Sequence, residues 1–222
     1  MCGRKNSENE ERGVSRNFKT EQEQFWAGDF GNEYIERNQG AAVDAANLGF
    51  TSRILSCMQP VKSVIEFGAN IGLNLKVFRA LVPGVELSAI EINLKAAEEL
   101  QRMGGIKVYP QSILDFQPDY QRDLVFIKGV LIHINPDSLP DVYDSMYKTA
   151  RRYICLAEYY NPVPVELTYR GNTGKLFKRD FAGEMLERYP DLRLVDYGFA
   201  YRRDVQFPQD DLTWFVLEKT GQ

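Results

Sequence analysis

The sequence predicts a three-layer α/β fold in which a seven-stranded, mostly parallel β-sheet lies between two layers of helices. From residue 60 onward, short apolar runs alternate with amphipathic helical segments, a pattern typical of parallel strands joined by helical crossovers. The final two apolar runs, residues 193–200 and 212–219, are joined by a turn-rich link without a helix. We therefore expect these two to pair antiparallel, with the last strand running against the others.

The elements follow in order along the chain. The expected strands are short runs rich in apolar and β-branched residues, at 61–67, 85–90, 106–109, 123–128, 153–158, 193–200 and 212–219. The expected helices between them carry apolar residues at helical spacing, at 71–81, 94–103, 138–152 and 179–189. Upstream, residues 18–38 fit two short helices broken near Gly28 and Gly31, and residues 40–58 fit a further helix that ends before Pro60.

Composition and charge limit the kind of protein. The 222 residues are 44% hydrophobic and 26% charged, which suits a globular domain with one core. The net charge of −4 argues against an extended basic surface, so we expect no nucleic-acid partner. No run of 18 apolar residues occurs, so we expect no membrane span. Since the first residues lack an apolar core and the three cysteines are isolated, we expect a cytoplasmic protein without disulfides or a metal site.

The N-terminal part differs from the rest. Residues 1–17 are polar and are expected to form a mobile tail, and residues 18–59 a helical segment ahead of the main domain at 60–222. Trp26, Phe30 and Tyr34 in this segment fit a lid that closes over a ligand, with Trp26 and Tyr34 in contact with the substrate. Aromatic residues at this density more often serve ordinary helix packing, and the two roles are compatible.

The strongest chemical signal is the segment VIEFGANIG, a buried strand that runs into a glycine turn and a helix. Gly68 permits a sharp turn, and Gly72 permits close approach of a ligand or of the helix to the strand. A ligand above this loop meets backbone N–H groups. Because Ala69 and Asn70 interrupt the G-x-G-x-x-G spacing that cradles a pyrophosphate, and Glu66 precedes the loop, the site suits an amine better than a dinucleotide. A generic strand-to-helix turn is the alternative.

Two further polar signals follow at strand ends. Glu91 ends the second strand, 23 residues after the first glycine, where a carboxylate can accept hydrogen bonds from two ribose hydroxyls. Ile92 follows it and can lie against an adenine face. After the third strand, QSILDF offers Ser112 and Asp115 to an adenine edge, or as turn and capping residues.

These segments together resemble the Rossmann-like class I S-adenosylmethionine-dependent methyltransferases over about residues 60–220. The resemblance implies that the glycine loop holds the methionine moiety of S-adenosylmethionine, the acidic residue its ribose and the third loop its adenine. The donor-binding residues expected on this basis are Glu66, Gly68, Ala69, Asn70, Gly72, Glu91, Ile92, Ser112, Ile113 and Lys128.

A narrower resemblance lies outside this core. The segments FWAGDFGNEYIERN, KGVLIHINP, AEYYNPVPVE and RGNTGKLFKRDFAGE are similar to the bacterial pseudaminic acid biosynthesis-associated methylases. That resemblance implies an association with surface-sugar genes, without establishing a substrate. One departure is Asn172, where the group leads us to expect a histidine after Arg170 and Gly171.

Three residues are candidates for the catalytic base. His133, the only histidine, follows the fourth strand, and its ordinary pKa near neutrality suits proton abstraction from a hydroxyl or amine. A buried packing histidine is an equal alternative. Glu158 and Tyr159 follow the fifth strand at the same sheet edge and are the other candidates. Tyr160 is expected to bind the substrate, and stacking as part of the cavity wall is the alternative.

A basic cluster lies between the fifth and sixth strands, in a region about residues 160–180 where this fold carries acceptor-binding insertions. Four cations occur within ten residues of an otherwise acidic chain, Arg170, Lys175, Lys178 and Arg179. As a helix-entry loop over the pocket they can clamp a carboxylate or phosphate. A solvated basic face is the alternative.

The sequence therefore predicts transfer of a methyl group from S-adenosylmethionine to an O or N atom of a small anionic metabolite, first of all an acidic sugar or sugar nucleotide. Rival hypotheses are a methyltransferase acting on protein or RNA, a donor-binding protein without transfer activity, and a nicotinamide enzyme. The oligomeric state stays open.

Overall fold

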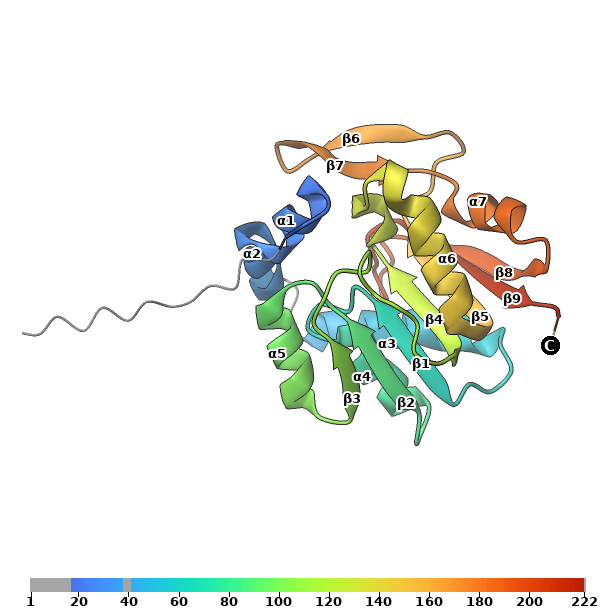
Figure 1. Ribbon diagram of the computed structural model, residues 1–222. Helices are drawn as coiled ribbons and strands as arrows, with labels where there is room; N and C mark the ends of the chain where they lie inside the picture. Colours follow the sequence, from blue (N-terminus) through green and yellow to red (C-terminus); the bar gives the residue numbers. More distant parts are fainter. Residues whose placement is uncertain (1–16, 38–40, 222) are drawn as a thin grey trace, which may run out of the picture.

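The computed structural model describes residues 17–37 and 41–221, so most of the predicted N-terminal tail lies outside the described residues. A seven-stranded sheet forms the centre, in the spatial order β3-β2-β1-β4-β5-β9-β8 (Figure 1). Its strands are β1 (Ser63–Phe67), β2 (Glu86–Ile90), β3 (Ile106–Tyr109), β4 (Arg122–Lys128), β5 (Ala150–Glu158), β8 (Leu192–Ala200) and β9 (Leu212–Lys219). Only β9 runs against its neighbours, because it pairs antiparallel with both β5 and β8. The predicted topology is confirmed.

The central strands are buried on both faces, which explains their nearly continuous apolar sequence. Successive side chains of β4 alternate between two cores: Val125 and Ile127 belong to one, and Leu124 and Phe126 to the other. Each core is closed by its own layer of helices. Together the two layers bury both faces of the sheet, as the alternation of strands and helices predicts.

Helices α6 (Leu139–Thr149) and α7 (Phe181–Arg188) cover one face of the sheet, and α3 (Ala41–Ser56), α4 (Leu73–Leu81) and α5 (Leu94–Met103) cover the other. Two short helices, α1 (Glu21–Ala27) and α2 (Asp29–Arg37), precede them. The predicted break lies at Gly28, whereas Gly31, also expected near the break, lies within α2. Short 3-10 turns η1 (Leu131–His133) and η2 (Pro136–Ser138) follow β4. No helix in the described part of the chain is long and apolar enough to span a membrane.

One predicted boundary is wrong. The helix expected over 138–152 ends at Thr149, and Ala150 already belongs to β5. The reason is tertiary pairing: Ala150 lies opposite Arg122 of β4, and the Arg152 Nε atom donates to Glu218 Oε1 of β9 at 2.7 Å. Strand pairing therefore outweighs the helical tendency of Arg151 and Arg152.

The basic cluster is a hairpin and not the expected helix-entry loop. Strands β6 (Val165–Tyr169) and β7 (Asn172–Lys178) form a separate antiparallel pair. Arg170 and Gly171 make the two-residue turn with φ of +48° and +83°, the left-handed values that short hairpin turns require. The hairpin lies near α1 and η1, beyond the carboxyl ends of the parallel strands (Figure 1).

Candidate active site

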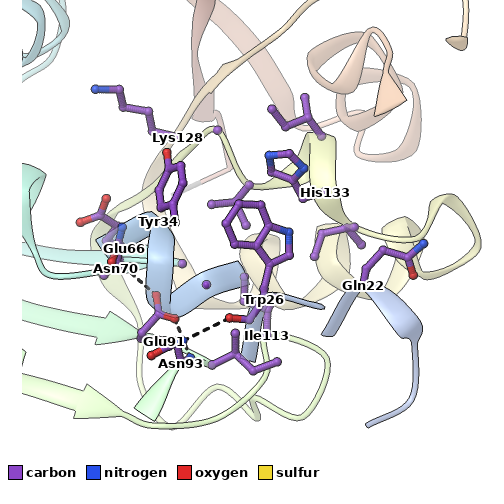
Figure 2. A pocket seen from close by; sticks show the side chains of 18 of the residues that line it. Gln22, Trp26, Tyr34, Glu66, Asn70, Glu91, Asn93, Ile113, Lys128 and His133 are labelled. Carbon is purple, nitrogen blue, oxygen red and sulfur yellow. Dashed lines mark hydrogen bonds between the residues drawn. The ribbon is translucent and has the colours of Figure 1, made fainter. Parts of the chain in front are cut away.

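A cavity of about 600 Å³ opens at the carboxyl edge of the parallel strands. Its floor comes from the loops that follow β1, β2, β3 and β4, and its walls come from α1, α2, η1, the β6–β7 turn and the link before β9. Figure 2 shows Trp26 standing in this cavity between Tyr34 and His133. The volume and the position at the strand ends are those of a small-molecule site.

The glycine loop after β1 forms one side of the floor. Gly68 has φ +74°, and a Cβ atom there would lie 2.7 Å from Val130 Cγ2, so only glycine fits. Its N–H and that of Ala69 donate to the Ile90 carbonyl at 2.9 and 3.0 Å, which ties the loop to β2. Asn70 follows with φ +47° and also lines the cavity.

Gly72 has another role. Its φ is +80°, and a Cβ atom there would lie 2.6 Å from Leu100 Cδ2 of α5. The residue is not among those that line the cavity. The sequence suggests that Gly72 permits close approach either of a ligand or of the helix to the strand. The structure shows instead that Gly72 permits close packing between the start of α4 and α5.

Glu91 sits at the end of β2 and is held by two backbone groups. Its Oε2 accepts from the Asn70 N–H at 2.6 Å and its Oε1 from the Asn93 N–H at 2.7 Å (Figure 2). Burial raises the pKa of Glu91, while these hydrogen bonds oppose the rise. Because each carboxylate oxygen accepts more than one hydrogen bond, this cavity-lining group retains capacity for hydroxyl donors of a ligand.

Glu66 and Lys128 place a carboxyl group and an amino group in the floor. Glu66 is 1% exposed; its Oε1 accepts from Asn74 Nδ2 at 2.6 Å, and its buried Oε2 has no hydrogen-bond partner among the described residues. Burial raises the pKa of Glu66 to about 8. The Lys128 Nζ atom donates to Asn47 Oδ1 at 2.8 Å, and burial lowers the Lys128 pKa. A cationic donor from a ligand would satisfy the open oxygen of Glu66.

The loop after β3 supplies an apolar wall. Ile113 is buried and lines the cavity together with Ile92 from the loop after β2. The Ser112 hydroxyl accepts from the Leu114 N–H at 3.0 Å, which serves a turn, and Ser112 also lines the cavity. Asp115 pairs with Lys19 Nζ at 2.7 Å, and is not among the cavity-lining residues.

His133 lies in η1 against two aromatic rings. Its centroid is 4.6 Å from that of Trp26 and 4.9 Å from that of Tyr169. The Nδ1 atom is 2.6 Å from the Lys175 carbonyl oxygen, which can only accept, so Nδ1 carries the proton and Nε2 a lone pair. Burial lowers the pKa of His133 to about 4. The imidazole is therefore neutral at physiological pH and carries a lone pair at Nε2, but its pKa lies below the near-neutral value for which the sequence suggests it as a base.

Glu158 and Tyr159 face different surroundings. Glu158 is buried, and its Oε1 accepts from the N–H groups of Val130 and Leu131, both at 3.0 Å, which anchors η1. It is not among the residues that line the cavity, whereas Tyr159 is. Tyr160 is 41% exposed and packs toward Phe215 outside the cavity.

The structure does not gather the four cations of the basic cluster at the cavity. Only Arg170 lines it. Lys175 pairs with Glu21 of α1 at 2.9 Å, and Arg179 pairs with Glu184 at 2.6 Å. The Lys178 Nζ atom lies 5.1 Å from the centre of the Tyr159 ring. Arg170 is thus the one member of this cluster placed to meet an anionic ligand.

Several cavity residues escape sequence reasoning because they come from distant segments. Asn47 of α3 accepts from Gln209 Nε2 at 3.2 Å as well as from Lys128, so the link before β9 closes one end. Further residues line the cavity from α1, α4, β6 and that link, and they include Gln22, Glu23, Asn74, Tyr169 and Asp210. Only Asn74 has a local signal, as a polar residue in the first turn after the glycine loop. No group of three or more His, Cys, Asp or Glu within residues 17–37 and 41–221 is placed to hold a metal ion.

Comparison with known proteins identifies the fold. No family model and no curated protein sequence matches the chain. The Burkholderia thailandensis 1,6-didemethyltoxoflavin-N1-methyltransferase, solved with 1,6-didemethyltoxoflavin and S-adenosylhomocysteine, superposes with a TM-score of 0.66 at 14% identity, over 90% of this chain and 87% of that one. Magnesium protoporphyrin IX methyltransferase from Synechocystis PCC 6803, solved with S-adenosylhomocysteine, gives 0.63 at 13%, over 89% and 97%.

A third structure, the plantazolicin methyltransferase BpumL with a pentazolic desmethylPZN analog and S-adenosylhomocysteine, gives 0.62 at 11%, over 89% of this chain and 94% of that one. At such identities the likeness establishes the fold alone. This chain has the Rossmann-like fold of class I methyltransferases, and the predicted fold class is confirmed.

Proposed function

We propose that this protein is an S-adenosylmethionine-dependent methyltransferase acting on a small molecule. The observation that carries the proposal is the pair of buried carboxylates at adjacent strand ends. Glu66 offers an unpaired oxygen, and Glu91 is aimed by the backbone of the glycine loop. The fold supports the same reading, because similar structures were solved with S-adenosylhomocysteine or S-adenosylmethionine bound.

The cavity residues fit the donor. The buried Glu66 Oε2 suits its ammonium group, Glu91 suits the two ribose hydroxyls, and Ile92 and Ile113 suit the two faces of adenine. When bound, the donor supplies an activated methyl group that leaves by direct in-line displacement. The protein contributes mainly alignment of the acceptor, together with exclusion of water from the cavity.

His133 is the base that we propose for the acceptor. Its Nε2 lone pair accepts the proton of a hydroxyl or amine as the acceptor atom attacks, and its Nδ1–H stays bonded to the Lys175 carbonyl. Glu158 positions η1, and so His133, through its bonds to Val130 and Leu131. Tyr159 remains the second candidate base, because it lines the cavity.

The acceptor that we propose is an acidic sugar or sugar nucleotide. Arg170 supports this choice, as a cation at the cavity wall able to meet a carboxylate or phosphate. The resemblance to the pseudaminic acid-associated methylases also supports it. The methyltransferases of similar structure act on chemically varied compounds, so they do not specify the acceptor. We further propose that α1 and α2 act as a lid and that the enzyme works in the cytoplasm.

Isothermal titration with S-adenosylmethionine and S-adenosylhomocysteine tests the donor site. We expect micromolar binding, weakened about tenfold or more in Glu91→Gln, because one oxygen that accepts hydrogen bonds becomes a donor. The matched control is Glu98→Gln on the exposed face of α5, where the same change should leave affinity unaltered. Absence of binding to wild type would refute the proposal. Binding without product from any acidic sugar would favour a donor-binding protein.

A further inference from the structure

Buried polar atoms without partners gather at the cavity. Nine side-chain nitrogen or oxygen atoms in the described part of the chain are buried without a hydrogen-bond partner, and five belong to residues that line this one cavity. Two of these, on Glu66 and Asn74, lie beside the glycine loop. The other three belong to Gln22, Glu23 and Trp26, all on α1. Native proteins leave few such groups unpaired, so a second cluster of them points to a second set of ligand contacts.

The orientation of Gln22 and Glu23 is fixed by the protein. The Gln22 Nε2 atom donates to the Gly174 carbonyl of β7 at 2.8 Å, which assigns the amide and leaves Oε1 as a free acceptor. Glu23 Oε2 accepts from the backbone N–H groups of Lys19 and Thr20, at 2.7 and 2.8 Å, in a capping box. Its Oε1 is left buried and unpaired. Gln22 is 4% and Glu23 6% exposed, so water does not reach them freely.

Trp26 completes the cluster on the same side of α1. It lies four residues after Gln22 and three after Glu23, so the three side chains share one helix face. Its indole N–H is buried without a partner, and its ring contacts His133. Figure 2 shows Gln22 on the His133 side of the Trp26 ring, away from Glu66 and Asn70 of the donor site.

We propose that this face of α1, defined by Gln22, Glu23 and Trp26, recognises the methyl acceptor, and that it takes the hydroxylated or amino-bearing part of a small polar molecule. The inference rests on the proposed function and specifies its substrate class. Two acceptor oxygens at Gln22 and Glu23 require O–H or N–H donors from the ligand, and the Trp26 N–H requires an oxygen. A hydroxyl group meets both requirements.

The same cluster excludes an anion from this face. The Glu23 carboxylate and the Gln22 carbonyl oxygen would both repel a carboxylate or phosphate. Any acidic group of the acceptor therefore points elsewhere, toward Arg170. The aromatic ring of Trp26 offers an apolar surface beside these polar atoms, which suits the mixed faces of a sugar ring. A hydroxyl held here also lies beside the base that we assign to His133.

Two probes test the proposal on protein saturated with S-adenosylhomocysteine. D-glucuronate carries hydroxyls and one carboxylate on a six-membered ring, and cyclohexanecarboxylate carries the carboxylate alone. Binding is followed by isothermal titration or by protein NMR. The variants are Gln22→Met and Trp26→Phe, which remove one polar group each and keep the size or aromatic character of the side chain. Gln24→Met, on the exposed face of the same helix, is the matched control.

We expect glucuronate to bind wild type at least about tenfold more tightly than cyclohexanecarboxylate, and to lose about tenfold in each α1 variant while Gln24→Met changes nothing. Cyclohexanecarboxylate should bind all variants equally. The proposal is overturned if the two probes bind alike, if glucuronate shows no saturable binding, or if Gln22→Met behaves as Gln24→Met does. The affinity for S-adenosylhomocysteine, measured in each variant together with its melting temperature, should stay constant. If wild type fails to bind S-adenosylhomocysteine, the proposed function fails, and the glucuronate titration without it still decides the role of α1.

Discussion

Substituting Gly72 by alanine separates packing from ligand binding in the glycine loop. Gly72 has φ +80°, and the added methyl group would lie 2.6 Å from Leu100 Cδ2 and 3.1 Å from Met103 Cε. Leu100 is fully buried in the core. The side chains of Leu100 and Met103 must therefore shift to admit the methyl group.

The expected cost has two parts. A left-handed backbone conformation costs a non-glycine residue about 1–2 kcal/mol, and overpacking a buried contact costs about 1–3 kcal/mol. Gly84→Ala is the matched control, because Gly84 has φ +77° but nothing lies within 4 Å of its Cβ position. It carries the first cost alone. Both variants gain equally from the stiffer unfolded chain, so that effect cancels in the comparison.

Urea unfolding of the three proteins measures the difference. We expect the free energy of unfolding of Gly72→Ala to lie about 1–3 kcal/mol below that of Gly84→Ala, and its melting temperature several degrees lower. Because Gly72 does not line the cavity, the affinity of the folded variant for S-adenosylhomocysteine should be close to that of wild type. Equal unfolding midpoints for the two variants, or lost binding at full stability, would refute the assignment of Gly72 to helix packing.

Three further predictions concern buried titratable groups. The Glu158→Gln variant should keep most of the methyl-transfer rate, because its remaining side-chain oxygen can still accept from the N–H groups of Val130 and Leu131. The Glu158→Ala variant should lower that rate. An equal loss of rate in both variants would identify Glu158 as the base. The pKa of His133 is about 4 in the folded protein and near 6.5 in the unfolded chain. The stability that the neutral imidazole contributes is therefore complete above pH 6.5 and declines toward pH 4, by up to about 3 kcal/mol. In His133→Gln, the urea midpoint should depend less on pH between pH 4 and 6.5. For Glu66 the pKa is raised to about 8, so its contribution is complete below about pH 4.5 and is lost as the pH rises to 8. The urea midpoint of Glu66→Gln, relative to that of wild type, should therefore be higher at pH 8 than at pH 5. A difference in urea midpoint that stays constant between these two pH values would contradict this prediction.

The sheet and the donor side of the cavity follow from local sequence. Each strand and its loop are continuous in the chain, and parallel strands bring their carboxyl ends to one edge. That is why the sequence alone places Gly68, Asn70 and Glu91 together, and the hydrogen bond from the Asn70 N–H to Glu91 joins two of these strand ends.

The acceptor side does not follow, for two physical reasons. The β6–β7 hairpin turns on Arg170 and Gly171, and arginine at the first left-handed position lacks the Asn or Asp that usually marks such a turn. The cationic residues of this region also suggest a ligand clamp, whereas Lys175 and Arg179 form ion pairs with Glu21 and Glu184 of the protein itself. The Lys175–Glu21 ion pair joins residues 154 positions apart, so it leaves no local trace in the sequence.

The position of β9 has a consequence for how the chain is made. This strand follows β8 in sequence but lies between β5 and β8 in the sheet. During synthesis, β5 therefore waits with an unpaired edge until residues 212–219 leave the ribosome, and β8 cannot join the sheet before them. Leu212 and the preceding link also complete the cavity wall. A nascent chain that ends ahead of β9 would thus expose an unpaired strand edge on β5 and lack part of the cavity wall.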